Sequence, residues 1–190
     1  MILHNEKIIA ETRAWVNRAV IGLNLCPFAK AVQVKGLVRY VVSDACDSTA
    51  LLTDLGDELQ GLAAANPARL DTTLLMHSHA LTDFIDFSYF LPAADALLKT
   101  LGLVGTLQIA SFHPDYQFAD AEPDDVTNAT NRAPYPTLHL LREDSIDRAV
   151  AAFPNAEAIY ENNMRTLETL GRSGWEALRE QCRRDAENTD

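Results

Sequence analysis

In the first two thirds of the chain, segments whose apolar residues follow helical spacing alternate with short apolar runs typical of strands. Segments with apolar residues at helical spacing lie at residues 5–20, 48–62 and 83–101. Short runs of β-branched and apolar residues predict strands at residues 37–42, 72–76 and 106–112. Because strands that alternate with helices of this length form right-handed βαβ crossovers, we expect these strands to be parallel.

Glycine and proline mark the predicted ends of the helices. Gly22 follows the first helix, and the helix cannot continue through Cys26-Pro27 because a residue before proline avoids the α region. Gly102 ends the helix over residues 83–101, and Pro92 is expected to kink or restart it.

The last third of the chain predicts one further strand and then helices. Apolar residues run almost continuously over residues 137–142, which indicates a fourth strand whose direction the pattern leaves open. A short helix from Asp144 or Ser145 to Phe153 is expected, followed by helices over residues 155–170 and 173–186. We therefore expect an α/β fold, with α+β as the alternative. It is a single domain over residues 1–190, with a mixed sheet of about four strands, flanking helices and a helical C-terminus.

A long loop, residues 113–136, joins the third and fourth predicted strands. It holds half of the eight prolines and no glycine, which favours a shaped surface over a flexible linker. In an open α/β sheet, ligands bind beyond the carboxyl ends of parallel strands, where this loop begins. The two ends of the loop are the predicted site, and its acidic middle, residues 120–125, is expected to be solvated.

The candidate catalytic residues are Cys26, His113 and Asp115. A histidine titrates near neutrality, so His113 suits a general acid or base, with Asp115 as the group that orients it. Cys26 lies in a loop between two elements, where its thiol is accessible for nucleophilic chemistry. The structural alternatives are a local hydrogen-bonded turn for His113 and Asp115, and core packing for Cys26.

Further polar residues of the loop and the fourth strand are candidates for substrate binding: Tyr116, Asn131, Arg132, Tyr135, His139, Arg142 and Glu143. Arg132 is the only basic residue of the loop, which favours an anion anchor or a fixed structural position over a random surface charge. Because side chains alternate along a strand, His139 and Glu143 are expected on one face and Arg142 on the other.

Motifs for cofactors are sparse. His77 and His79 follow the second strand at a spacing that one metal ion could bridge, and solvated surface is the alternative. Cys26-Pro27 is also compatible with a thiolate ligand to haem. The chain has no GxGxxG, P-loop or GxSxG motif, so the cofactor stays undefined.

Charge and composition limit the classes of partner that we expect for this protein. The chain carries 27 acidic and 16 basic residues and a net charge of -11, which repels phosphate backbones and makes nucleic acid an unexpected partner. Apolar runs are too short for a bilayer and the first residues lack signal-peptide features, so we expect a cytoplasmic protein without a membrane partner. The three cysteines are expected as free thiols. The oligomeric state stays open.

Four separated motifs carry a family resemblance: residues 21–28 (IGLNLCPF), 111–118 (SFHPDYQF), 131–136 (NRAPYP) and 139–143 (HLLRE). Together they resemble a bacterial family registered as domain of unknown function 1415, and the resemblance spans nearly the whole chain. It implies that the candidate catalytic and substrate-binding residues are motif positions. His77 and His79 lie outside these motifs, which weakens the metal interpretation.

The leading functional hypothesis is an enzyme of hydrolase or transferase type that acts on a small anionic metabolite. In it Cys26 is the nucleophile, His113 the acid or base, Asp115 its orienter and Arg132 the anion anchor. This arrangement requires Cys26 to fold over the end of the third strand. The alternatives are a non-catalytic protein that binds a small molecule or another protein, and a metal- or haem-binding protein.

Overall fold

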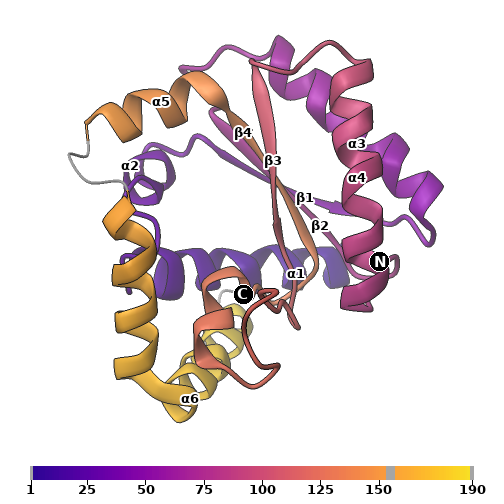
Figure 1. Cartoon of the computed structure of the whole chain (residues 1–190). Coiled ribbons are helices and arrows are strands. Elements are labelled where there is room, and N and C mark those ends of the chain that lie inside the picture. The colour runs from indigo at the N-terminus through magenta and orange to yellow at the C-terminus, as the bar shows by residue number, and fades with distance from the viewer. Residues whose placement is uncertain (1, 153–156, 189–190) are drawn as a thin grey trace.

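The chain folds around one mixed sheet of four strands. In the computed structural model, which describes residues 2–152 and 157–188, the strands are β1 (Val38–Ser43), β2 (Thr72–His77), β3 (Leu107–Phe112) and β4 (Thr137–Arg142). Their order is β1-β2-β4-β3, with β1 parallel to β2 and β4 antiparallel to both β2 and β3 (Figure 1). The first three strands therefore point the same way, as predicted. The fourth strand, whose direction was open, lies antiparallel between β2 and β3.

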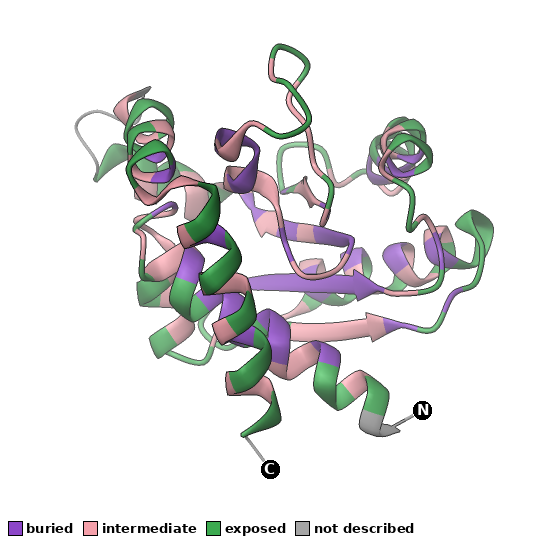
Figure 2. Cartoon of the chain, turned by 90° about the horizontal axis from the view of Figure 1, so that it is seen from below, coloured by how far each residue is buried: buried purple, intermediate pink, exposed green. Residues whose placement is uncertain are grey.

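Helices cover both faces of this sheet. On one face lie α3 (Ser48–Ala64) and α4 (Phe84–Thr100), and on the other side lie α1 (Ile2–Trp15), α2 (Ala29–Val34) and α6 (Glu157–Glu187) (Figure 1). Strand side chains alternate between two apolar clusters, so that Leu75 packs towards α3 and α4 whereas Leu74 and Met76 pack towards α1 and α6. β2 is buried along its whole length, as Figure 2 shows, which explains its continuous apolar run. The fold is a single α/β domain.

The helix α4 continues through Pro92, so the predicted restart at this proline is wrong. Phe87 and Phe90 before the proline and Ala94 and Leu98 after it are buried in the same cluster. Tertiary packing of one apolar face therefore outweighs the local cost of a proline inside the helix. Asp83 fixes the start of α4, because its carboxylate accepts hydrogen bonds from the amides of the first turn.

The N-terminal helix is longer than predicted and changes its winding. α1 passes directly into η1 (Val16–Ile21), a π-helical segment, and the chain then forms the short helix α2, which the sequence pattern did not indicate. π-helical turns are rare and recur at functional sites. In this protein η1 turns Val16 and Val20 towards the sheet, where both line an apolar cavity.

The C-terminal helices agree with the predicted interruption. α6 contains Gly171 at φ 69°, a left-handed conformation that suits glycine and kinks the helix between the two predicted segments. α5 (Glu143–Ala151) precedes it. The predicted helix end at Phe153 and the predicted start at residue 155 lie outside the described residues. Within the described part of the chain, every helix is too short or too polar to span a bilayer.

Candidate functional site

The loop over residues 113–136 is held by its own hydrogen bonds. Asn128 is fully buried in the short helix η2 (Val126–Asn131), where its Oδ1 accepts from the Phe118 amide at 3.0 Å and its Nδ2 donates to the Glu122 carbonyl at 2.8 Å. The amide of His113 donates to the carbonyl of Asn131 at 3.2 Å, which joins the two ends of the loop. These contacts give the shaped surface that the proline-rich, glycine-free composition predicted.

Arg132 holds this loop in place. Its Nε donates to the carbonyl of Tyr116 at 2.9 Å and its Nη2 to the carbonyl of Pro123 at 2.7 Å. Both acceptors are neutral, so the guanidinium charge is not cancelled by either contact. The sequence predicted a fixed position for this single basic residue, and its Nε and Nη2 atoms hold the loop.

His113 is fully buried at the end of β3, on the face covered by α4. Its ring lies 5.4 Å from the ring of Phe84 and 5.3 Å from that of Phe87, centroid to centroid. Nδ1 accepts a hydrogen bond from the backbone amide of Asp115 at 3.0 Å. The Asp115 backbone, rather than its carboxylate, therefore fixes the imidazole, and the pair forms the local turn that was the structural alternative.

His77 is buried in the same manner at the end of β2. Its Nδ1 donates to the carbonyl of Ala80 at 2.8 Å, and burial lowers its pKa to about 4. His79 is exposed, with its ring 5.8 Å from that of His4. The two histidines of the predicted metal pair thus occupy different environments. Across residues 2–152 and 157–188, no group of three or more His, Cys, Asp or Glu side chains is placed to hold a metal ion.

An apolar cavity of about 350 Å³ lies on the opposite face of the sheet. Its floor is formed by side chains of β1 to β4, and its walls by η1, the segment from Cys26 to α2, and α5. The lining side chains are mostly apolar and include Trp15, Cys26, Leu74, Ala110, Phe112 and His139.

His139 is the imidazole in the floor of this cavity. Its Nε2 lies 2.7 Å from Thr72 Oγ1, and that hydroxyl donates its single proton to the carbonyl of Leu140 at 2.6 Å. Thr72 must therefore accept from His139, which places the ring proton on Nε2 and leaves the Nδ1 lone pair free to accept. Burial lowers the pKa of His139 to about 4, so the ring is neutral at pH 7.

Cys26 forms part of the cavity wall, in a segment that is fixed from two sides. The carbonyl of Leu25 accepts from Nδ2 of the buried Asn163 on α6 at 2.9 Å, and the amide of Cys26 donates to the carbonyl of Val20 at 3.3 Å. The structure does not bring Cys26 and His113 together, because they lie on opposite faces of the sheet. The histidine that shares a cavity with Cys26 is His139.

The remaining predicted site residues are dispersed. Tyr116 packs against Phe84 beside His113, and the Tyr135 hydroxyl donates to Glu11 Oε2 on α1 at 2.8 Å. Arg142 and Glu143 lie at the opposite end of the strands from His113, because β4 runs antiparallel to β3. Arg142 donates to the carbonyls of Leu62, Ala65 and Leu70, which caps the C-terminus of α3. Glu143 Oε1 accepts from the amide of Gly105.

Several cavity residues were not singled out from the sequence. Thr72, Phe112 and Trp15 all look like core positions in a linear pattern, since each lies within an apolar strand or helix. The signal that identifies them is the alternation of strand faces: Thr72, Leu74, Ala110, Phe112 and His139 share one face once the register is known.

The sheet, its two covering layers and the apolar cavity define a single-domain α/β protein with a pocket on one sheet face. The chain belongs to the family described as "Protein of unknown function (DUF1415)", whose model matches residues 7–177. This confirms the resemblance seen in the four motifs. Comparisons with curated proteins and with solved structures give no match.

Proposed function

We propose that this protein binds a small, mostly apolar molecule in the cavity, and that the ligand donates one hydrogen bond to Nδ1 of His139. The observation that supports this is a neutral imidazole acceptor in the floor of a mostly apolar cavity. Asp71 and Ser145, which also line it, are hydrogen-bonded to each other. Ligand sites typically combine an apolar lining with a few placed polar groups that orient the ligand. His139 supplies such a group, and Thr72 fixes its tautomer.

The size and polarity of the cavity define the ligand class. A volume of about 350 Å³ is near the lower end of the range of roughly 300–1,000 Å³ for ligand pockets, so the molecule is small. An anionic group placed in this cavity would lose its hydration without a cationic partner, because the lining holds the carboxylate of Asp71 and no lysine or arginine. We therefore propose a neutral hydroxyl or amine on an apolar body for this cavity, in place of the anionic metabolite expected from the sequence.

A matched ligand pair tests the proposal. We expect 1-naphthol, which carries one hydroxyl, to bind about fivefold more tightly than naphthalene, because a neutral hydrogen bond contributes roughly 1 kcal/mol. His139→Leu should abolish that preference while naphthalene binding persists. Ligand-observed NMR titration measures both affinities.

A cavity-filling variant locates the binding. Ala110→Leu adds a side chain at the cavity floor and should weaken both ligands, whereas Ala96→Leu, on the exposed side of α4, should weaken neither. Equal binding of 1-naphthol to these two variants would place the ligand elsewhere and refute the proposal.

A thiol enzyme is the second candidate function, and the presence of Cys26 and His139 in one cavity favours it. Alkylation of Cys26 separates the two candidates in a Cys46→Ser background, which removes the exposed thiol. For a binding protein we expect iodoacetamide to alkylate Cys26 slowly at pH 7, at similar rates with His139 and in His139→Leu. A rate that is already maximal below pH 7, and that drops in His139→Leu, would instead favour the enzyme.

A further inference from the structure

Arginines from two distant segments gather between the long loop and the second half of α6. Arg132 follows η2, and Arg172 and Arg179 lie two helical turns apart on α6, after the kink at Gly171. Burial lowers the pKa of Arg132, and while Asp115 raises it, the positive charges of Arg179 and Arg172 lower it further. Like charges are therefore held close together in a chain whose net charge is -11.

A small cavity of about 30 Å³ opens within this group. Arg132, Arg179 and Arg183 line it together with Trp15 and Trp175. The two indoles are 3% and 4% exposed, and their Nε1 atoms are buried without a hydrogen-bond partner. A buried N–H donor without an acceptor is costly, so two such donors on residues of one cavity wall favour binding of a group that accepts hydrogen bonds.

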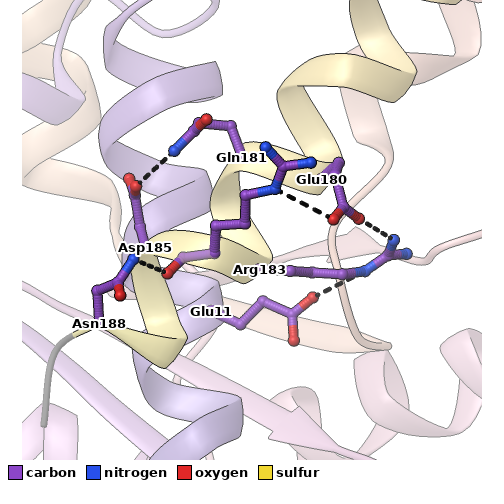
Figure 3. Close-up of polar contacts among 7 residues, drawn as sticks. Glu11, Glu180, Gln181, Arg183, Asp185 and Asn188 are labelled. Atoms are coloured by element: carbon purple, nitrogen blue, oxygen red, sulfur yellow. Dashed lines mark hydrogen bonds and ion pairs between the residues drawn. The ribbon is translucent and has the colours of Figure 1, made fainter.

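The other groups around this cavity do not neutralise the whole cluster. Glu11 is the carboxylate in the cavity wall, and it is already engaged by the Tyr135 hydroxyl and by Arg183 at 3.6 Å. Figure 3 shows Arg183 between Glu11 and Glu180. Burial raises the pKa of Cys182, the other titratable group in the wall, to about 11, so its thiol is neutral.

Arg132 and Arg179 are the two arginines of this group without an ion pair in the described part of the chain, although the charges of Asp115 and Asp125 partly offset that of Arg132. Arg172 has an ion pair with Asp124 at 3.7 Å, whereas Arg132 donates to carbonyls. Arg179 makes no ion pair or hydrogen bond within residues 2–152 and 157–188. Guanidinium groups and indole N–H groups are all donors, and together they call for an acceptor with negative charge.

We propose that this arginine–tryptophan pocket binds an oxyanion, a phosphate or carboxylate group, through Arg132, Arg179 and the indole N–H donors of Trp15 and Trp175. A volume near 30 Å³ equals that of about one water molecule, so the pocket takes the terminal oxygens of the group and not a whole metabolite. The ligand is a small free anion or the anionic end of a larger molecule. The site is separate from the apolar cavity, although Trp15 lines both.

The two tryptophans of the chain are suitable reporters. In a Trp15→Phe variant the only indole is Trp175, which lines the arginine pocket and not the apolar cavity. We expect inorganic phosphate or acetate, added at constant ionic strength with sodium chloride, to change the Trp175 fluorescence saturably. Saturation by phosphate alone would identify a phosphate group as the ligand chemistry, and saturation by acetate a carboxylate.

Charge variants in this background test the role of the arginines. Arg179→Gln should weaken the saturable response about tenfold or more, because it removes a charge-assisted hydrogen bond. Arg165→Gln, an equally conservative change at an exposed arginine of the same helix, should leave it unchanged. Equal responses in the two variants would overturn the proposal. So would the absence of a saturable response to either anion in this background together with an unchanged melting temperature of the parent chain, which keeps Trp15.

Thermal unfolding of the otherwise unmodified chain gives a second readout. A ligand that binds only the folded state raises the melting temperature, and the rise grows with the logarithm of the ligand concentration once that exceeds the dissociation constant. We expect the anion to raise the melting temperature of the parent chain and of Arg165→Gln, and to leave that of Arg179→Gln nearly unchanged. Equal increases in all three proteins would indicate a general salt effect and refute the site. These results do not depend on whether 1-naphthol binds the apolar cavity.

Discussion

Arg142→Met is expected to lower the free energy of unfolding by about 3–4 kcal/mol, a large share of the stability of a domain of this size. Arg142 is 7% exposed, and its guanidinium donates to the carbonyls of Leu62, Ala65 and Leu70. Methionine replaces the apolar stem of the arginine and has no donor, so the last carbonyls of α3 would lose a charged partner inside the protein. Urea denaturation followed by circular dichroism measures the change.

The control is Arg39→Met, the same substitution at an arginine of β1. The Arg39 side chain is 52% exposed and pairs with Glu58 at 2.9 Å. Exposed ion pairs contribute little, so we expect a loss below about 1 kcal/mol. Similar losses in the two variants would show that Arg142 is not the cap of α3. The sequence placed Arg142 among the substrate-binding candidates, and its contacts give a structural reason for its presence in the motif.

Acidification from pH 7 to pH 4 is expected to destabilise the protein through His77 and His139. Burial lowers the pKa of each to about 4, against about 6.5 for the unfolded chain. Between these values the unfolded state binds more protons than the folded state. The stability is therefore complete above about pH 6.5 and declines as the pH falls to 4, by about 2–3 kcal/mol for each histidine.

His77→Asn isolates this contribution. The asparagine Nδ2 occupies the position of the histidine Nδ1, so it can still donate to the carbonyl of Ala80, but it does not titrate. The loss of stability between pH 7 and pH 4 should shrink by about 2–3 kcal/mol in this variant. Comparison with the parent chain removes the opposite effect of acidification on the net charge of -11.

His79→Asn serves as the control at an exposed histidine of the same segment. We expect its pH profile of stability, measured by urea denaturation at each pH, to match that of the parent chain. An unchanged pH profile in His77→Asn would mean that the folded and unfolded states bind the His77 proton equally, and it would contradict the lowered pKa of this histidine.

Local sequence signals predicted most of the elements because those signals act over a few residues. The strands β1 to β4, the helices α3 and α4, and the break in α6 at Gly171 follow from periodicity, capping and glycine geometry. α2 was not predicted because six residues carry little periodicity. The restart expected at Pro92 was wrong because packing on both sides of the proline holds α4 together.

The candidate site was harder to predict because it depends on which face of the sheet each residue occupies. Cys26 follows a predicted helix and His113 follows a predicted strand. No local sequence signal shows that the two residues lie on different faces of the sheet. Only the insertion of β4 between β2 and β3 shows that His139 faces the side of Cys26, and that His113 faces α4. Because β4 is antiparallel to β3, Arg142 and Glu143 lie beside the start of β3, at the opposite end of the strands from His113.

By itself, the sequence determined the class of fold, the family, the shaped loop and the importance of Arg132, because each rests on local composition or on contiguous motifs. The tertiary structure alone decided that Cys26 and His139 line one cavity and that Arg132 lies near Arg179. The physical reason is that both arrangements join segments far apart in the chain, and strand order, strand direction and helix docking fix such contacts through packing of the whole domain.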